Sequence, residues 1–343
     1  MKSIVIHSAK NLRIEEQQST PPGPGEVQIA LATGGICGSD LHYYHQGGFG
    51  SIRLREPMIL GHEVAGYVTK LGQGVTNLDV GQLVAISPSR PCGTCKYCQE
   101  GLQNHCLNMR FYGSAMPFPH IQGAFRQVLN ADASQCAVAD GLSPGEAAMA
   151  EPLAVTLHAT HLAGSLVGKT VLVTGCGPIG ILAILCARRA GADHIVATDL
   201  SDFTLGLARQ LGADEGINMA TNPQGLDPFC KNKGSFDVLY ECSGAASALA
   251  AGIHTMRPRS TVLQLGLGGD MTLPMQALTA KELSLKGSFR FHDEFHTGVS
   301  LMQKGLIDVK PLITHTFGLD DAVLGFEQAS DRTQAIKVQI DFS

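Results

Sequence analysis

Four cysteines crowd into one short stretch of the sequence, with the spacing Cys92-x2-Cys95-x2-Cys98-x7-Cys106. Spacings this short allow a single loop to wrap a tetrahedral cation, and thiolates are ligands that suit zinc. A set of four thiolates leaves no open coordination position, so we expect this zinc to be structural. A redox or disulfide cluster and an iron–sulfur cluster are the alternatives for these residues.

Three further residues are candidates for a second, open zinc site. Cys37 lies in a glycine-bordered segment, and His62 lies between Gly61 and Glu63. Glu151 stands between two apolar runs, so we expect it to be buried, and a buried carboxylate needs a partner such as zinc. Three protein ligands would leave a fourth position for water or substrate. Taken alone, Cys37 is better explained as a buried thiol and His62 as a surface imidazole than as zinc ligands.

A glycine-rich turn, Gly175-Cys176-Gly177-Pro178-Ile179-Gly180, matches the dinucleotide-binding pattern G-x-G-x-x-G. Its glycines would allow a tight turn, close approach of a pyrophosphate and close packing of helix on strand. Asp199 follows at about the ~20-residue distance at which a carboxylate binds the adenosine ribose. The three residues after Asp199 include no arginine for a 2′-phosphate, which favours NAD and leaves NADP possible. The alternative is a packing turn and a helix-capping aspartate.

The elements that must position these residues change in character near residue 152. Before it, short apolar runs broken by glycine and proline predict a β-rich domain. After it, strands and helices alternate, which is typical of parallel βαβ units. The tail from about residue 290 should fold back onto the first domain and end in a strand, Lys337–Phe342. The other expected strands are Val27–Leu31, Leu83–Ile86, Val171–Thr174, His194–Thr198, Phe236–Glu241, Thr261–Leu265 and Leu283–Phe289, and the expected helices are Ile179–Ala190 and Phe203–Leu211.

Composition excludes several classes of protein. A chain of 343 residues is long enough for two domains. The formal charge of -5 leaves no broad basic face for phosphates, which argues against nucleic-acid binding. The uncharged stretch 170–187 is interrupted by glycines and a proline, so we expect no membrane span. The first residues show no long apolar core and no small-residue cleavage site, so we expect no signal peptide. The clustered cysteines favour metal in a reducing compartment, so we expect a cytoplasmic protein.

The residues around His62 carry a resemblance to a known family. The pattern Gly61-His62-Glu63-x2-Gly66-x5-Gly72-x2-Val75 matches the signature of zinc alcohol dehydrogenases. With the Cys37 segment, the four-cysteine loop and the glycine turn, the whole chain resembles the medium-chain family of zinc dehydrogenases. That resemblance implies an α/β plus β fold: a GroES-like β-rich catalytic domain over residues 1–152 and 290–343, and a Rossmann domain with a doubly wound parallel sheet over 153–289. It also implies a homodimer or homotetramer.

The resemblance assigns roles to individual residues. It implies a catalytic zinc bound by Cys37, His62 and Glu151, with Glu63 as a rival ligand, and a second, structural zinc on the four cysteines. Ser39 and His42 resemble a proton relay from the substrate hydroxyl to solvent. Cofactor contacts are implied for Gly175, Gly177, Pro178, Ile179, Gly180, Asp199, Ser243, Leu265, Gly266, Ser288 and Phe289.

Within the family the chain resembles the polyol branch. The segment from Cys37 to Tyr43 is similar to sorbitol dehydrogenases, and the segments 109–116 and 287–291 are similar to dehydrogenases of L-idonate. Tyr43, Phe111 and Arg290 match substrate-pocket positions, and Arg110 or Arg290 could bind the carboxylate of a sugar acid. The resemblance therefore implies hydride transfer between a small sugar acid or polyol and NAD(P), with L-idonate converted to 5-ketogluconate. A surface salt bridge or a contact to cofactor phosphate is the alternative for the two arginines.

Two other functions remain open from the sequence. The first is another dehydrogenase activity, on sorbitol, xylitol or L-threonine. The second is a catalytically silent member of the family with a structural or cofactor-sensing role. The presence of Cys37, Ser39, His62 and Glu151 argues against the silent protein.

Overall fold

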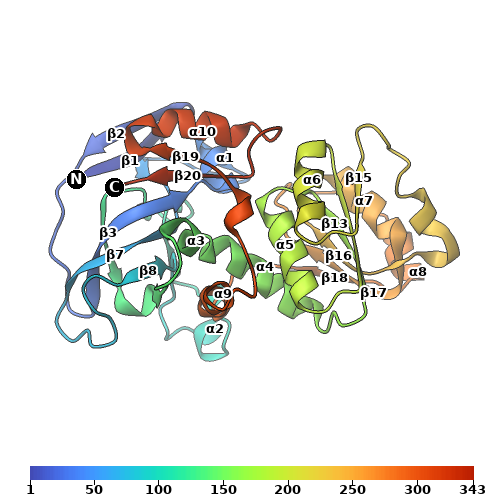
Figure 1. The fold of residues 1–343 in the computed structure, drawn as a ribbon, viewed down its shortest axis with the longest axis horizontal. Coiled ribbons are helices and arrows are strands. Elements are labelled where there is room, and N and C mark those ends of the chain that lie inside the picture. Colours follow the sequence, from blue (N-terminus) through green and yellow to red (C-terminus); the bar gives the residue numbers. More distant parts are fainter. The chain divides into compact units, whose positions relative to one another are not determined.

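The computed structural model describes residues 1–343 and divides into two compact units (Figure 1). The first unit comprises Met1–Glu151, His292–Asp331 and Lys337–Ser343. The second unit comprises Pro152–Phe291 and Arg332–Ile336. The chain passes from the first unit to the second within helix α4, Ala150–Ala163.

The first unit is built on a seven-stranded sheet in which the central path runs β12-β8-β7-β3-β20-β19 and β11 pairs with β3. The C-terminal strand β20 pairs antiparallel with β3, so the tail lies in the same sheet as the N-terminal region. A second sheet joins β2, β1 and β6. The strands are β1 Lys2–Ser8, β2 Asn11–Glu16, β3 Glu26–Gly35, β4 Gly48–Phe49, β5 Ile52–Arg53, β6 Met58–Ile59, β7 Glu63–Leu71, β8 Leu83–Ile86, β9 Ser89–Arg90, β10 Arg110–Phe111, β11 Val128–Asp132, β12 Cys136–Val138, β19 Ile313–Gly318 and β20 Lys337–Asp341.

Short helices occupy the connections of the first unit. Helix α3 begins with a capping box, because Ser143 accepts from the amide of Glu146 and Pro144 takes the first helical position. Helix α1 begins after Cys37, and Gly47 closes it in the left-handed conformation. The helices are α1 Gly38–Gln46, α2 Lys96–Gln99, α3 Pro144–Ala148, α9 Glu294–Gln303 and α10 Ala322–Ser330, with the 3-10 turns Gln103–His105, Ala133–Gln135, Lys310–Leu312 and Leu319–Asp321.

The second unit contains a six-stranded sheet in the order β15-β14-β13-β16-β17-β18, and every pair is parallel. In chain order this is 3-2-1-4-5-6, the doubly wound arrangement that was expected, with the switch point between β13 and β16. The strands are β13 Thr170–Thr174, β14 His194–Asp199, β15 Glu215–Asn218, β16 Phe236–Glu241, β17 Met256–Gln264 and β18 Ser284–Gly287. The helices are α5 Pro178–Arg189, α6 Asp202–Gln210, α7 Ala246–Thr255 and α8 Met275–Ala280, with a 3-10 segment, Asp227–Lys233.

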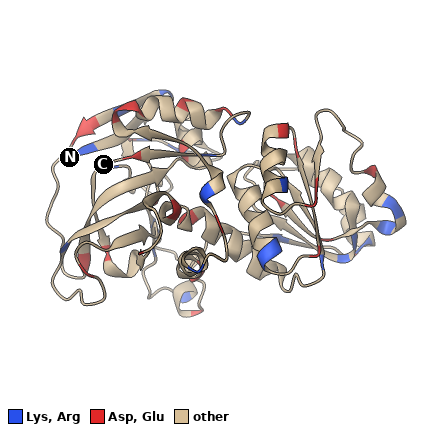
Figure 2. Ribbon diagram, viewed as in Figure 1, with Lys and Arg blue, Asp and Glu red and all other residues tan.

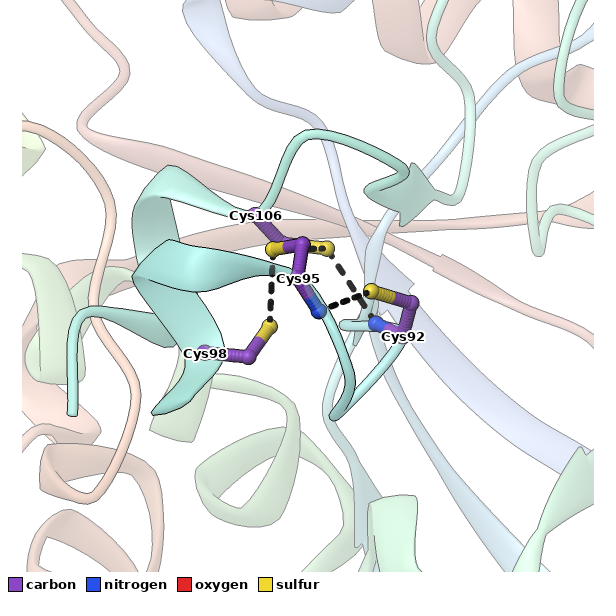
Figure 3. Close-up of side chains that lie close together, drawn as sticks. All are labelled: Cys92, Cys95, Cys98 and Cys106. Carbon is purple, nitrogen blue, oxygen red and sulfur yellow. Dashed lines mark hydrogen bonds between the residues drawn. The ribbon is translucent and has the colours of Figure 1, made fainter. Parts of the chain in front are cut away.

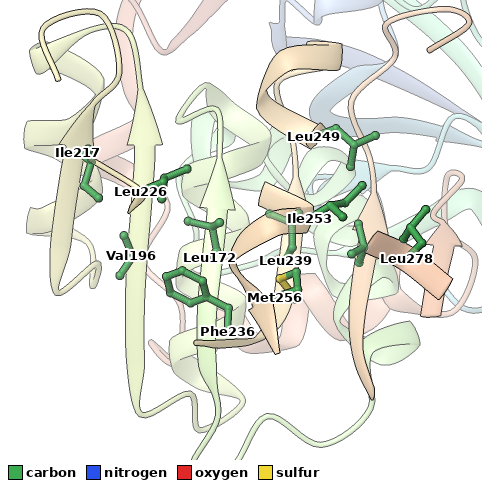
Figure 4. Packing of buried hydrophobic residues seen from close by; sticks show 11 residues of the cluster. Leu172, Val196, Ile217, Leu226, Phe236, Leu239, Leu249, Ile253, Met256 and Leu278 are labelled. Carbon is green, nitrogen blue, oxygen red and sulfur yellow. The ribbon is translucent and has the colours of Figure 1, made fainter. Parts of the chain in front are cut away.

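The core of the second unit explains its uncharged central strands. All six residues of β16 are buried, because both faces of a parallel sheet are covered. Figure 4 shows Leu172 and Leu239 of neighbouring strands beside Leu249 and Ile253 of α7, in one cluster with Phe236. Burial of these side chains fixes the strands, and with them the edge at which their carboxyl ends meet.

Figure 2 shows acidic and basic residues on both units. No helix of the structure has both the length and the apolar character that crossing a membrane requires.

Candidate functional site

The four-cysteine loop brings its sulfur atoms together. All four ligand atoms lie within 4.8 Å of one another, and Figure 3 shows the side chains converging from one loop. The Cys95 and Cys98 sulfurs are 3.5 Å apart, far beyond a disulfide bond of ~2.05 Å. All four cysteines are free. The geometry therefore matches a tetrahedral cation site better than a disulfide cluster.

Backbone amides of the loop donate hydrogen bonds to these sulfur atoms. The Cys95 amide donates to Cys92 Sγ at 3.4 Å, and the Cys92 amide donates to Cys106 Sγ at 3.2 Å. Hydrogen bonds from the backbone and side chain of Thr94 and from the Cys95 amide lower the pKa of the Cys92 thiol to about 5. Desolvation raises the pKa of Cys98 to about 12, and shared hydrogen bonds with Cys95 and Cys106 add to that rise. A bound divalent cation would remove this difference between the thiol pKa values, because it stabilises every thiolate that it binds.

A second group of possible metal-ligand atoms lies in the first unit, where strand β3 ends and strand β7 begins. The ligand atoms of Cys37, His62 and Glu63 lie within 4.8 Å of one another. Cys37 follows the end of β3 and precedes α1, whereas His62 directly precedes β7. The antiparallel pairing of β3 with β7 places Gly35 opposite Glu63, and this register brings the two segments together.

Asp40 fastens the same two segments to each other. It is fully buried, and its carboxylate accepts from the Cys37 amide at 3.0 Å and from the Gly61 amide at 3.2 Å. Its Oδ1 also lies 3.8 Å from Nδ1 of His62. Asp40 was not among the residues predicted from the sequence, although an aspartate three residues after an N-cap is a recognisable capping signal.

His62 supplies the observation that favours a metal here. The side chain is buried, and its Nδ1 has no hydrogen-bond partner. Buried polar atoms are normally paired, so an unpartnered imidazole nitrogen in a group with a thiol and a carboxylate suits a zinc site. Desolvation raises the pKa of Cys37 to about 12, and the charge of Glu63 adds to it. Bound zinc would reverse that penalty, so these residues fit the ion.

The two candidate carboxylate ligands differ in their partners. Both oxygens of Glu63 accept from Nζ of Lys337, at 2.8 and 2.6 Å, and both residues are buried. Lys337 also donates to the carbonyl of Ile36 at 3.2 Å. Glu151 lies in the first turn of α4 and is buried. Its burial raises its pKa to about 8; Glu63 and Cys37 add to this rise and His62 opposes it.

Of the four residues expected to bind substrate, one has a contact with the Cys37–His62 group, and the contacts found for the others are elsewhere. The ring centroid of Phe111 lies 5.5 Å from that of His62, so this residue does flank the Cys37–His62 group. Arg110, the preceding residue, is exposed. Tyr43 is buried, and its hydroxyl accepts from the Ala115 amide at 3.1 Å. Arg290 belongs to the second unit, has φ 56°, and places its guanidinium 4.9 Å from the ring of Phe289.

The relay residues lie on one helix. Ser39 and His42 are three positions apart in α1, a spacing that puts side chains on one face. The Ser39 amide donates to the sulfur of Cys37. The ring of His42 lies 5.7 Å from the ring of Phe49.

The glycine turn of the second unit has the backbone that the pattern predicts. Gly175 follows β13 with φ 83°, and a Cβ on it would lie 2.8 Å from Ser243. A Cβ on Gly180 would lie 1.8 Å from the carbonyl oxygen of Gly175. Gly177 is the N-cap of α5 and Pro178 takes the first helical position, so the turn leads directly into a helix amino end, the kind of position at which anions bind.

Asp199 stands at the end of β14 and organises the turn itself. Its Oδ2 accepts from the Cys176 amide at 2.6 Å, and its Oδ1 accepts from the Leu200 amide at 2.7 Å. A cation that was not predicted from the sequence lies beside this turn. Arg332 has Nη1 3.7 Å from the position that a Cβ of Gly177 would take.

The other expected cofactor residues all follow strands of the same sheet. Ser243 follows β16, Leu265 and Gly266 follow β17, and Ser288 and Phe289 follow β18. The Ser288 amide donates to the carbonyl of Gln264 at 2.9 Å, and its hydroxyl oxygen is buried without a partner. In open α/β sheets, ligands bind at this carboxyl edge near the switch point. The structure therefore gathers these residues at the edge where a dinucleotide would bind.

Comparison with known proteins defines the class. Residues 23–141 match the alcohol dehydrogenase GroES-like domain, and residues 178–304 match the zinc-binding dehydrogenase domain. The chain belongs to the zinc-binding dehydrogenase family. It is a zinc-dependent oxidoreductase with a nicotinamide dinucleotide cofactor, as the sequence predicted, and its fold combines the GroES-like and Rossmann domains that were expected.

Particular relatives lie within that family. L-idonate 5-dehydrogenase (NAD(P)(+)) of Escherichia coli is 42% identical over 345 residues, covering 99% of this chain and 98% of the relative. Its crystal structure superposes with a TM-score of 0.94, covering 99% and 97% of the two chains. Sorbitol dehydrogenase of Gallus gallus is 35% identical, covering 98% and 95%. The structure of 2R,3R-butanediol dehydrogenase of Bacillus subtilis matches with a TM-score of 0.89 at 29% identity, covering 99% of each chain.

Proposed function

We propose that this protein oxidises a secondary hydroxyl of a sugar acid with NAD, and that L-idonate, converted reversibly to 5-ketogluconate, is the first substrate to test. The observation that carries the chemistry is the buried group of Cys37 and His62, with its unpartnered imidazole nitrogen. The observation that supports the substrate is 42% identity over nearly the whole length of an L-idonate 5-dehydrogenase.

We assign the catalytic zinc to Cys37, His62 and Glu151. Glu63 is the rival, but Lys337 already donates to both of its oxygens, whereas the buried carboxyl of Glu151 still needs a cation to be ionised. Bound zinc supplies a Lewis acid that lowers the pKa of a coordinated hydroxyl. The four cysteines hold the second, structural zinc.

Within the site, each remaining residue has one task. Phe111 covers one side of His62 and excludes water from it. Ser39 would accept the proton of the substrate hydroxyl while giving up its own, which would pass through the cofactor ribose to His42 and from there to solvent, since imidazole is the side chain best suited to exchange protons near neutral pH. Arg290 or Arg110 binds the carboxylate of the sugar acid through its planar guanidinium.

For the cofactor, we assign the pyrophosphate to the amino end of α5 and the adenosine ribose to Asp199. A carboxylate there accepts from the ribose hydroxyls and repels a 2′-phosphate, so we propose NAD in preference to NADP. Arg332 adds a positive charge beside the turn and would interact with the pyrophosphate. We assign the remaining contacts with the cofactor to five residues that follow strands of the same sheet: Ser243, Leu265, Gly266, Ser288 and Phe289.

A substrate panel tests the proposal. L-idonate, sorbitol, xylitol and L-threonine are each supplied with NAD or NADP, and formation of reduced cofactor is followed by absorbance. We expect the highest kcat/KM for L-idonate with NAD, and two zinc ions per chain by metal analysis. A clear preference for sorbitol or xylitol would favour a neutral-polyol dehydrogenase, which the 35% identity to sorbitol dehydrogenase supports as the second candidate. Cofactor binding without turnover of any substrate would favour a silent protein.

We further propose a homodimer or homotetramer in the cytoplasm. Strand β18 lies at one end of its sheet, all four of its residues are exposed, and Leu285 and Phe289 are each 42% exposed. An exposed edge strand with apolar side chains is suited to pairing with a second copy. The ten free cysteines are compatible with a reducing compartment. Light scattering of the purified protein would test the assembly.

A further inference from the structure

A buried carboxylate at the end of β16 takes no part in the chemistry proposed above. Glu241 is the last residue of that strand, and its side chain is completely buried. An ionised carboxylate in the protein interior must be compensated by hydrogen bonds or by a cation. The donors around Glu241 are neutral, and they come from two strands, β13 and β17, and from the loop that follows β16.

The carboxylate of Glu241 is bonded on both oxygens. Oε1 accepts from the Ser243 amide at 2.9 Å, from the Ser243 hydroxyl, from the Gly244 amide at 3.1 Å and from the Thr174 hydroxyl at 3.4 Å. Oε2 accepts from the Gly244 amide at 3.1 Å and from the Gln264 side-chain amide at 2.7 Å. One side chain therefore holds a loop and two neighbouring strand ends together.

These partners lie at the carboxyl ends of adjacent strands. Thr174 ends β13, Gln264 ends β17, and β16 lies between these two strands in the sheet. The main-chain carbonyl of Glu241 also accepts from the amides of Leu265 and Gly266, each at 2.9 Å. The network thus surrounds the switch point at which a dinucleotide binds in this kind of sheet.

The glycines of the site are packed against this network. A Cβ on Gly175, the first glycine of the turn, would lie 2.8 Å from Ser243, which Glu241 holds. A Cβ on Gly266 would lie 2.7 Å from Oε2 of Glu241 itself. Contacts this close mean that a shift of the Glu241 carboxylate would move the loop that packs against the glycine turn.

We propose that Glu241 is a positioning residue for the dinucleotide: its carboxylate clamps the loops after β16 and β17 against the glycine turn and so sets the affinity for NAD. This inference rests on the cofactor site proposed above. Glu241 acts through Ser243, Gly244 and Gln264 and does not itself need to touch the cofactor.

The clamp requires a carboxylate in particular. Glutamine has the same size but offers one acceptor oxygen and one donor group. In a Glu241→Gln variant the amide NH2 would have to face either the backbone amides of Ser243 and Gly244 or the NH2 of Gln264. The first orientation sets donor against donor, and the second does so too unless Gln264 turns its unpartnered side-chain oxygen to the new amide and gives up its bond to the Gly266 carbonyl. In each case one partner group loses a hydrogen bond and the loop shifts.

Asp237 provides a matched control. It is a buried carboxylate of the same strand, at the opposite end, and it accepts from the amide and hydroxyl of Thr170 at 2.9 and 3.1 Å. It also pairs with Arg257 of β17 and, at 3.5 Å, with Lys169, so its contacts join β16 to β13 and β17 at the end of the sheet away from the proposed cofactor site. An Asp237→Asn variant measures what the loss of a buried carboxylate does to stability alone.

The test compares dissociation constants for NADH, measured by fluorescence titration, in the full-length zinc-loaded wild type, Glu241→Gln and Asp237→Asn. We expect Glu241→Gln to bind NADH about tenfold more weakly, as loss of one buried hydrogen bond implies, with KM for NAD raised more than kcat is lowered. Asp237→Asn should lower Tm but leave the NADH affinity unchanged. Two zinc ions per chain should remain in both variants.

A second variant covers the case in which Glu241→Gln does not fold. Gln264→Met removes one donor to Glu241 and should weaken NADH binding by a factor of about three. An unchanged dissociation constant in a folded Glu241→Gln or Gln264→Met variant would overturn the inference, and so would equal weakening by Asp237→Asn. A wild type that binds neither NADH nor NADPH would instead refute the proposed cofactor site.

Discussion

The two candidate zinc sites of the first unit are built in different ways. The four-cysteine loop draws all its ligand atoms from one stretch, from Cys92 to Cys106, and backbone amides of that stretch hold the sulfurs. The Cys37–His62–Glu63 group forms between the end of β3 and the start of β7, Lys337 of β20 binds its carboxylate, and Glu151 of α4 is the second buried carboxylate proposed as a ligand. A closed site can be local because it only has to hold an ion. An open site needs the rest of the fold to keep one position free and to decide which ligands reach it.

The largest expected effect separates catalysis from stability. Replacing Cys37 with serine removes a thiolate from the open site, so we expect kcat to fall at least about a thousandfold, because the Lewis acid is lost. One zinc ion per chain should remain in the four-cysteine loop, and Tm should change little. Turnover and metal content are measured on the same preparation. Serine at the exposed Cys230 serves as control and should change neither quantity.

The reverse pattern is expected for the closed site. Cys106→Ser should lower the free energy of unfolding by roughly 3–5 kcal/mol, because binding energy of a structural zinc is folding energy. The fraction that remains folded should retain most of its kcat. Denaturant unfolding with and without a chelator gives the stability. If Cys106→Ser lost turnover in proportion to Cys37→Ser while staying fully folded, the distinction between the two sites would be wrong.

The competition between carboxylates gives a sharper comparison within the open site. We expect Glu151→Gln to weaken retention of the catalytic zinc more than about tenfold, since it removes a ligand. Glu63→Gln should have a smaller effect on zinc, because Lys337 donates to both oxygens of that carboxylate. Competition with a chelator, read as zinc released over time, compares the two variants. The opposite ranking would identify Glu63 as the ligand.

The smallest effect concerns the proton path, which only the open site needs. We expect His42→Gln to lower kcat about tenfold near neutral pH, with partial recovery at high pH as hydroxide replaces the imidazole as proton acceptor. Zinc content should stay the same. His45→Gln is the matched control, because His45 lies in the same helix but pairs with the hydroxyl of Ser330 at 2.7 Å. Parallel pH–rate profiles of wild type and His42→Gln would exclude the relay.

Local sequence patterns predicted the bounds of a strand or helix well where a single motif or apolar run marks both of its ends. Strand Leu83–Ile86 has the predicted bounds, and the helix after the glycine turn differs from the prediction by one residue at each end. Strand β15, Glu215–Asn218, was not predicted, because its short and polar sequence lacks the apolar alternation of a strand. Strand β17 begins at Met256, five residues before the predicted start, and the additional segment contains Pro258, a residue that argues against a strand in sequence-based prediction.

The sequence by itself determined the chemistry that depends on short spacings: a four-thiolate loop, a glycine turn between strand and helix, and a thiol and imidazole of the zinc dehydrogenase type. Such motifs can be read because neighbouring residues in the chain must also be neighbours in space. Only the tertiary structure decided that Lys337 binds Glu63 across 274 residues, that Asp40 ties Cys37 to Gly61, and that Glu241 joins three strand ends. These contacts depend on strand register and burial, which no local pattern fixes.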